Sequence, residues 1–256
     1  MFYNNIDPVL LRIGYLEIRY YGIIYALGFV IAYYFLLYFV KNKKLKLSSE
    51  EIADLLFYLL IGIVIGARLF EVLFYNLPYF IQNPVEIFKV WHGGLSFHGG
   101  LVGAVVAALI FCRKKKLKFY ALADAVVFPL SLALALGRIG NFINGELYGT
   151  VTSVPWCVKF RGIPSCRHPS QLYESFKNLL IFGILWFIKD DRIEGKKLPP
   201  GFLFWTFVVL YALFRFAIES FKEPIVQLGF FSMGELLCIV MFGVGVVFMW
   251  KLFKKP

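Results

Sequence analysis

Long stretches of this sequence carry no charge. Residues 20–40 contain no acidic or basic side chain, and residues 230–250 contain only Glu235. Charged residues make up 17% of the 256 residues and hydrophobic ones 60%, above the roughly 45–50% apolar content of soluble domains. A helix that crosses a bilayer needs about 20 mainly apolar residues. The scarcity of charge therefore excludes an ordinary soluble fold and predicts a body embedded in a lipid bilayer.

Acidic residues are especially scarce, with 16 against 27 basic ones. The basic residues stand in short blocks between apolar runs and form no soluble basic face, so we expect no nucleic-acid partner. The start of the chain lacks the basic segment and short apolar core of a cleavable signal. We therefore expect the first apolar run to be retained. No Leu-x-Gly-Cys sequence lies near the start, so we expect the chain itself to carry no lipid.

Hydropathy predicts an all-α integral membrane protein with seven transmembrane helices. The whole chain, residues 1–256, is expected to form one transmembrane domain. No internal repeat is visible, which argues against the inverted-repeat architecture of many transporters. We expect the spans at residues 18–40, 52–75, 93–112, 119–140, 170–188, 201–221 and 230–250.

The basic residues between the spans predict the orientation. Sixteen Lys and Arg residues follow the first, third, fifth and seventh spans, and seven lie on the other side. Loops rich in Lys and Arg stay in the cytoplasm, so the N-terminus is expected outside and the C-terminus in the cytoplasm. Residues 145–169 form no span on the outer side and contain three prolines. We expect them to make a small external loop domain or cap.

Cysteine is scarce as well, with four residues. Cys157 and Cys166 lie in the outer loop, whereas Cys112 and Cys238 lie at or within spans. An oxidising compartment on the outer side of the membrane would permit a disulfide between Cys157 and Cys166. Two unrelated loop thiols remain the alternative.

Polar side chains inside the spans gather at one depth. With a rise of about 1.5 Å per residue, the predicted orientation places them in the outer half of the membrane. Asp54 and Asp124 are exceptions, and we expect both to be solvated near the inner ends. Charges inside a membrane normally face a cavity, a partner or a pathway, so a site reached from outside is predicted. The layer consists of Tyr20, Tyr21, Tyr25, Arg68, Glu71, His98, Arg138, Glu174, Arg215, Glu219 and Glu235.

Several members of this layer have a structural interpretation beside the functional one. Arg215 and Glu219, four residues apart, could simply neutralise each other. For Arg68 we favour a structural role, and Glu235 could only stabilise the positive end of its helix. The glycines of residues 92–100 could serve tight helix packing or chemistry. The two histidines of that segment have no Cys or third His nearby in sequence, so no metal site is expected.

The most informative stretch is residues 137–149, which ends the fourth span. It contains four glycines, two asparagines, Arg138 and Glu146. Glycines let backbone N–H groups approach an anion, and the planar fork of arginine matches phosphate oxygens. Packing alone would explain the glycines but not Arg138, Asn141 and Glu146 together. The stretch therefore indicates an anion site.

The chain resembles the phosphatidylglycerol–prolipoprotein diacylglyceryl transferase family along essentially its whole length. Residues 137–149 carry the most specific part of the likeness, and five further motifs accompany them. These are Tyr20-Tyr21-Gly22, Gly66-Ala67-Arg68-Leu69, Gly94-Leu95-Ser96-Phe97-His98-Gly99-Gly100, His168-Pro169-Ser170-Gln171-Leu172-Tyr173-Glu174, and Arg215-Phe216 followed by Glu219.

The resemblance implies a bacterial inner-membrane enzyme whose active site faces the periplasm. It implies phosphatidylglycerol as the lipid donor and the lipobox cysteine of a prolipoprotein as the acceptor. The products would be a thioether-linked diacylglycerol and glycerol 1-phosphate, as in the first step of lipoprotein maturation. We expect Tyr21, His98, Arg138 and Arg215 to be catalytic, and Arg138, Asn141, Glu146, Gly149, Arg215 and Glu219 to bind phosphatidylglycerol.

The chain departs from the family pattern at Lys222, where an arginine is expected before Pro224. If this side chain anchors a head group, lysine offers a point charge instead of a fork. The outer loop is also short for the family, which leaves its part in substrate recognition open.

The implied reaction is displacement at the glycerol carbon bonded to phosphate, with the acceptor thiol as nucleophile. A thiol with a pKa of about 8.5 reacts as the thiolate, so a base near it is useful. His98 supplies the imidazole of the layer, a group that titrates near neutral pH. Arg138 and Arg215 suit the departing phosphate. This chemistry requires no cofactor.

A non-enzymatic seven-helix lipid or anion transporter is the alternative. A transporter should have broken helices at the midplane or polar groups reaching both faces, whereas these groups crowd one face. A retinal receptor is disfavoured because the seventh span has no interior lysine. An intramembrane serine protease is disfavoured because nothing like a nucleophile elbow surrounds Ser96.

Overall fold

The computed structural model describes every residue except 1, 43, 191, 194–195, 224–226 and 255–256. Lys43 and Lys255, which contributed to the charge count above, therefore lie outside the described residues. The chain divides into two compact units. Unit 1 comprises Met1–Phe35 and Ala123–Pro256, and unit 2 comprises Leu36–Leu122. Two helices, α1 (Tyr20–Lys41) and α5 (Phe119–Asn144), run from one unit into the other.

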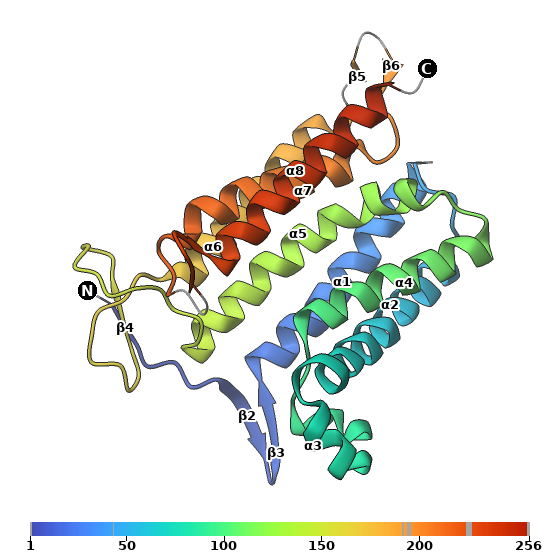
Figure 1. The fold of residues 1–256 in the computed structure, drawn as a ribbon. Coiled ribbons are helices and arrows are strands. Elements are labelled where there is room, and N and C mark those ends of the chain that lie inside the picture. The colour runs from blue at the N-terminus through green and yellow to red at the C-terminus, as the bar shows by residue number, and fades with distance from the viewer. Residues whose placement is uncertain (1, 43, 191, 194–195, 224–226, 255–256) are drawn as a thin grey trace. The chain divides into compact units, whose positions relative to one another are not determined.

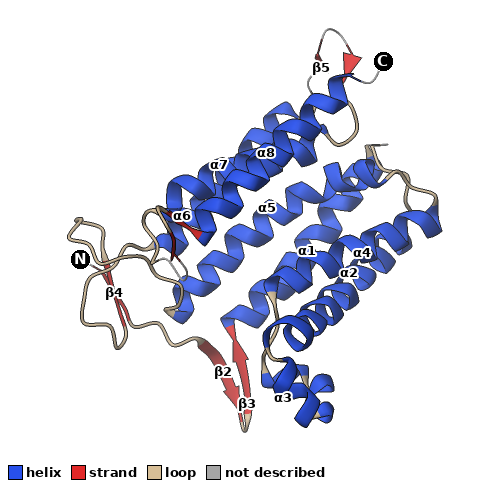
Figure 2. Ribbon diagram, viewed as in Figure 1, coloured by secondary structure: helices blue, strands red, loops and turns tan. Residues whose placement is uncertain are grey.

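Unit 1 is built on helices, with strands only in short two-stranded pairs among its described residues (Figure 2). Strand β1 pairs in parallel with β4, and β2 and β3 form an antiparallel hairpin. Helices α6, α7 and α8 lie side by side (Figure 1). The elements are β1 (Phe2–Asn4), β2 (Val9–Ile13), β3 (Leu16–Arg19), β4 (Val158–Phe160), α6 (Ser170–Ile188), β5 (Arg192–Ile193), β6 (Lys196–Lys197), α7 (Phe202–Glu219), β7 (Gln227–Leu228), β8 (Phe231–Ser232) and α8 (Met233–Lys254).

Aromatic contacts hold the helices of unit 1 together. Trp205 of α7 stacks on Phe248 of α8, with ring centroids 4.5 Å apart and an angle of 5° between the planes. Phe128 of α5 meets Phe182 and Trp186 of α6 edge to face, at 6.3 and 6.0 Å. Offset and edge-to-face geometries are the favoured ones for aromatic pairs. Unit 1 therefore packs its helices through large rings.

Asp124 has a role that the sequence did not indicate. Its carboxylate accepts hydrogen bonds from the backbone N–H groups of Gly201, at 2.6 Å, and Phe204, at 2.8 Å. These groups open α7, whose first N–H groups have no partner within the helix. The expectation that Asp124 is solvated was wrong. It caps a helix whose N-cap residue, Gly201, lies 77 residues later in the chain. A contact this far apart in sequence cannot be predicted from a local pattern.

Unit 2 is a pair of helices that approach each other through glycine. Gly62 and Gly66 of α2 face Gly99 and Gly103 of α4, and a β-carbon on Gly62 would lie 2.6 Å from the Gly103 carbonyl oxygen. This spacing of small residues is typical of close helix contacts in membranes. The elements are α2 (Ser49–Phe70), the π-helical turn Glu71–Tyr75, α3 (Leu77–Gln82), the 3₁₀ turns Pro84–Phe88 and Val90–His92, and α4 (Phe97–Lys115).

Six helices in the described part of the chain are long and apolar enough to cross a membrane. They correspond to six of the seven predicted spans, so a multi-pass all-α membrane architecture is confirmed. The remaining predicted span, residues 170–188, forms α6 at the predicted bounds but is not among the six. Its first turns contain a polar group of buried residues, which includes Gln171, Glu174 and Lys177. The count of seven spans thus remains a prediction.

The predicted loop domain at residues 145–169 is short and cross-linked. Cys157 and Cys166 form a disulfide, with their Cα atoms 5.6 Å apart. Within the loop, Arg167 bridges to both Val151 and Val158. Strand β4 of this loop pairs with β1 at the start of the chain. The disulfide interpretation of the two cysteines is therefore confirmed.

Candidate active site in unit 1

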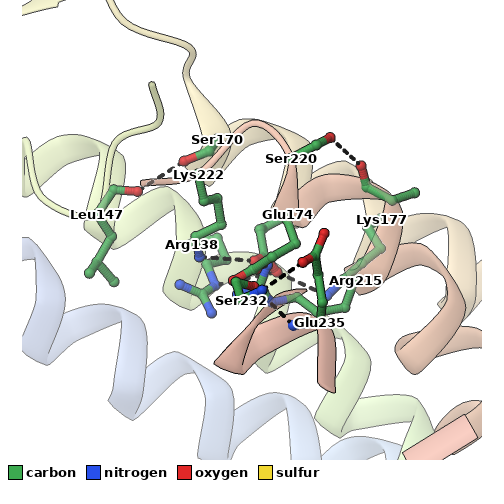
Figure 3. Close-up of polar contacts among 12 residues, drawn as sticks. Arg138, Leu147, Ser170, Glu174, Lys177, Arg215, Ser220, Lys222, Ser232 and Glu235 are labelled. Atoms are coloured by element: carbon green, nitrogen blue, oxygen red, sulfur yellow. Dashed lines mark hydrogen bonds and ion pairs between the residues drawn. The ribbon is translucent and has the colours of Figure 1, made fainter. Parts of the chain in front are cut away.

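The polar face of α6 centres on Glu174, which is 1% exposed. Its oxygen Oε2 lies 2.9 Å from Lys177 Nζ and 3.9 Å from Arg138 Nε. Its oxygen Oε1 lies 3.2 Å from Arg215 Nε and 3.3 Å from Lys222 Nζ. Figure 3 shows these side chains converging on Glu174 from α5, α6, α7 and the segment after α7. Four cations from separate parts of the sequence thus share one carboxylate.

This ion-pair network carries more positive than negative charge. It contains four cations and two carboxylates, because Arg215 also pairs with Glu219. The network is therefore two charges positive. Buried charge without a partner is costly, and arginine donors match phosphate oxygens. Burial of the ammonium lowers the pKa of Lys222. The arrangement suits a phosphate anion.

Glu219 is engaged on two sides. It pairs with Arg215, as the neutralising interpretation requires, and its Oε1 accepts a hydrogen bond from Ser232 Oγ at 3.3 Å. Glu235 accepts from the Ser232 N–H at 2.7 Å, and Ser232 Oγ accepts from the Glu235 N–H at 3.1 Å. This reciprocal pattern is a capping box at the start of α8. The helix-start interpretation of Glu235 is confirmed.

The signature segment folds back on itself where α5 ends. Asn141 Nδ2 and Asn144 Nδ2 both donate to Glu146 Oε1, at 2.8 and 3.2 Å. Gln171 Nε2 of α6 donates to the Glu146 carbonyl at 2.7 Å. Leu147 adopts a left-handed backbone with φ of 56°. The segment is therefore fixed to the first turn of α6, three residues from Glu174.

Gly149 joins the signature segment to Lys222. The two residues form an isolated β-bridge, and a β-carbon on Gly149 would lie 2.9 Å from His168 Cβ and closer still to the Phe221 carbonyl oxygen. No larger residue fits at this crossing without a shift. Gly149 thus sets the place of the backbone that carries Lys222.

Tyr21 lies beside the signature segment on α1. Its hydroxyl is 3.1 Å from that of Tyr25, and its ring borders Gly140, where a β-carbon would lie 2.9 Å from Tyr21 Cδ2. The structure thus groups Tyr21 with the other predicted site residues of unit 1.

His98 belongs to unit 2 and is described within that unit. It is exposed, and its Nδ1 lies 3.4 Å from the Tyr75 hydroxyl. Ser96 starts the helix, accepting the Gly99 N–H at 3.3 Å. Gly99 and Gly100 are buried against α2. The packing interpretation therefore holds for these glycines, while the histidine remains accessible.

Arg68 is a structural residue, as we favoured. Its side chain is buried and donates to backbone carbonyls that close the turns after α2. Three of these acceptors are Ile87 at 3.0 Å, Gly93 at 2.6 Å and Gly94 at 2.9 Å. It borders a cavity of about 310 Å³ together with Glu71 and Glu86. No group of three or more potential metal ligands occurs among the residues that the structure describes.

Reasoning from sequence missed two members of the network. Glu174 appeared in the polar layer but not among the site residues, and Lys177 did not appear at all. The signal was present, because an acidic and a basic residue three apart in an apolar helix form a buried pair. This signal is weak, because the same spacing is expected of two charges that only neutralise each other.

The model of the prolipoprotein diacylglyceryl transferase family matches residues 8–251. The chain belongs to this family. Three curated relatives carry the name phosphatidylglycerol–prolipoprotein diacylglyceryl transferase. The protein from Geobacter sulfurreducens is 46% identical over 96% of this chain and 95% of its own length. Those from Desulfotalea psychrophila and Coxiella burnetii are 41% and 44% identical, covering 98% and 92% of this chain and 95% and 89% of their own lengths.

Membership in this transferase family confirms the resemblance stated from the motifs. The chain is an enzyme, a diacylglyceryl transferase with several membrane-embedded helices. The transporter alternative is not favoured by these relatives.

Proposed function

We propose that this chain transfers the diacylglyceryl group of phosphatidylglycerol to the lipobox cysteine of a prolipoprotein. Donor and acceptor are those in the names of its relatives. The product is a thioether, with glycerol 1-phosphate as the second product. The observation that carries the proposal is the network of four cations on buried Glu174, two charges positive, beside the signature segment.

In the proposed step, the cysteine sulfur attacks the glycerol carbon bonded to phosphate. A C–S bond forms, the C–O bond breaks, and its electron pair leaves with the phosphate oxygen. The thiol proton passes to a base. Charge therefore gathers on the phosphate as the bond breaks, and fixed cations in a water-poor site stabilise that charge. The reaction balances without an oxidant or a cofactor.

Arg138 and Arg215 bind the phosphate in this proposal. Their side chains are 23% and 17% exposed, so each can meet an anion while its Nε faces Glu174. Glu219 orients Arg215 by pairing with it. Lys222 adds a point charge at Glu174 Oε1, the carboxylate oxygen that Arg215 also faces. The lipid phosphate thus supplies the negative charge that balances the excess of cations.

The signature segment contributes mainly by shape. Asn141 and Glu146 hold the turn after α5 through their mutual hydrogen bond, and Gly149 permits the close crossing with Phe221. The Tyr21 ring borders α5 at Gly140, and its hydroxyl lies 3.1 Å from that of Tyr25. We assign Asn141, Glu146 and Gly149 to phosphatidylglycerol binding, and we assign Tyr21 to catalysis.

His98 is the proposed base. For this role its Nδ1–H must donate to the Tyr75 hydroxyl, leaving the Nε2 lone pair to accept the thiol proton. A hydrogen bond to one ring nitrogen fixes which nitrogen carries the proton.

The proposed setting is the bacterial inner membrane, with seven spans including α6. The N-terminus and residues 145–169 lie outside, the C-terminus lies in the cytoplasm, and the site faces the periplasm. The asymmetry of basic residues supports this orientation. The Cys157–Cys166 disulfide suits an oxidising compartment. The chain acts as a single domain over residues 1–256.

A reporter that is active only in the cytoplasm tests the orientation. Fusions after Lys46, Lys116 and Lys197 should be active, and fusions near Asn83 and Ser153 should be inactive. Cytoplasmic activity at both outer positions would overturn the seven-span arrangement.

Purified protein, phosphatidylglycerol labelled in its acyl chains and a lipobox peptide test the activity. The label should move to the peptide and glycerol 1-phosphate should appear in equal amount. A control peptide with serine in place of the lipobox cysteine should stay unlabelled. Label that merely crosses a vesicle bilayer, without reaching the peptide, would support a transporter instead.

A further inference from the structure

Lys177 differs from the other cations of the network in its burial. Its side chain is 2% exposed, against 23% for Arg138, 17% for Arg215 and 16% for Lys222. The other three can meet an anion that arrives at the site. The Lys177 ammonium is enclosed by protein, so any effect on the substrate must pass through its neighbours.

The neighbours of Lys177 hold it from two sides. Its Nζ lies 2.9 Å from Glu174 Oε2 and 3.7 Å from the centre of the Tyr211 ring. A cation over an aromatic face is attracted by the ring electrons. Tyr211 lies four residues before Arg215 on α7, one helical turn away. Lys177 therefore ties the Glu174 carboxylate to the helix that carries Arg215.

Arg138 faces the same carboxylate oxygen as Lys177. Its Nε lies 3.9 Å from Glu174 Oε2, whereas charge-assisted N–H···O bonds are normally about 2.7–2.9 Å long. Lys177 occupies that oxygen at hydrogen-bond distance and Arg138 does not. The guanidinium of Arg138 thus lies near the carboxylate, but its Nε is beyond hydrogen-bond distance of it.

We propose that Lys177 is a positioning residue for phosphatidylglycerol binding, an inference that rests on the proposed function. By holding Glu174 Oε2, the lysine keeps the Arg138 fork available to the lipid phosphate. Without the lysine, Arg138 closes onto Glu174, and the carboxylate then competes with the phosphate for the same donors. Loss of one positive charge from the network also weakens binding of the lipid phosphate.

Binding of glycerol 1-phosphate to the detergent-solubilised chain tests this role without requiring turnover. Lys177→Met should raise its Kd, and the KM for phosphatidylglycerol, by about tenfold or more, the usual effect of one charge-assisted contact. The KM for the lipobox peptide should not change. The matched control is Lys189→Met, at the C-cap of the same helix. Lys189 also pairs with a carboxylate, Asp190 at 2.8 Å, and lies 4.1 Å from the Trp186 ring. Both constants should stay at wild-type values in this control.

The double variant Glu174→Gln/Lys177→Met separates positioning from packing. It removes the carboxylate that would capture Arg138, so the Kd for glycerol 1-phosphate should return to within about threefold of the wild-type value. If Lys177→Met alone does not fold, the Kd of the double variant for glycerol 1-phosphate is judged against the same limit of about threefold. A wild-type Kd in Lys177→Met, or a Kd in the double variant still raised about tenfold, overturns the role of Lys177. Transfer by the wild-type chain tests the proposed function separately.

Discussion

Arg68 in unit 2 and Arg138 in unit 1 both lie in predicted spans, yet their surroundings differ. Arg68 is 6% exposed, and backbone carbonyls of the turns after α2 take its donors. The Arg138 side chain is 23% exposed and stands 3.9 Å from the carboxylate it faces. An arginine whose donors are used by the backbone stabilises a fold. One whose donors are not used in this way is available to a ligand, and charge in a membrane alone does not tell the two apart.

The largest effect that we expect belongs to His98, in the same unit as Arg68. His98→Gln should keep the fold and lipid binding but lower turnover by roughly 10²–10⁴, the usual contribution of a general base. Raising the pH should recover part of the rate, because more of the acceptor thiol then ionises unaided. Turnover across a pH series, with thermal unfolding as control, measures this. Near wild-type turnover in a folded variant would remove His98 from the mechanism. A joint loss of stability and activity without rescue would make it a packing residue.

Removal of the Arg138 fork should have the next largest effect. Arg138→Ala and Arg215→Ala should each lower kcat/KM by about 10²–10³, as loss of a preorganised donor to developing charge does. In Arg138→Ala the melting temperature should change little, because Glu174 keeps three other cations. Arg138→Lys should restore only part of the rate, since it keeps the charge and loses the fork. Full activity in Arg138→Lys would show that charge alone suffices.

Arg68→Ala should lower stability and leave catalysis nearly unchanged, the opposite of what we expect for Arg138→Ala. Its loss leaves several backbone carbonyls without their donor and a gap where the buried side chain was, so we expect the free energy of unfolding to fall by about 2–4 kcal/mol. The folded fraction should keep its kcat/KM within a few fold. Denaturation and activity measured on the same preparation decide this. An Arg68→Ala protein of wild-type stability and lost activity would erase the distinction between the two arginines.

The smallest effect on catalysis should come from the disulfide. Replacing Cys157 and Cys166 by serine opens a ring of ten residues. On the loop-entropy account, this lowers the free energy of unfolding by about 2–3 kcal/mol. We expect weaker pairing of β1 with β4 and activity within about threefold of wild type. Thiol reagents should label neither cysteine before reduction and both after it. Labelling of both without a reductant would contradict the bond.

Sequence alone predicted the helices well, because each apolar run is a local property. Residues 170–188 became α6 at the predicted bounds, and residues 202–219 became α7 within two residues of the prediction. The β2–β3 hairpin was missed, since its strands are short and its turn depends on Gly14 with φ of 59°.

The sequence predicted that the polar residues of the site lie at one depth in the membrane. It did not predict that they form one ion-pair network. Orientation placed Arg138, Glu174 and Arg215 at one depth, and the signature segment indicated an anion. Their convergence on one carboxylate depends on helix rotation and packing, which hydropathy does not report. Lys177 was missed for that reason, because whether its side of α6 is buried is decided by α7 and its Tyr211 ring.

The parallel pairing of β1 with β4 has a consequence for the order in which the protein is made. Phe2, Tyr3 and Asn4 pair with Val158, Lys159 and Phe160, more than 150 residues later in the chain. At a synthesis rate of about 5–20 residues per second, the first strand waits about 8–30 seconds for its partner. During that interval its backbone has no partner from β4, while the helices between them are already being inserted. The beginning of this protein can therefore take up its final structure only after more than half of the chain exists.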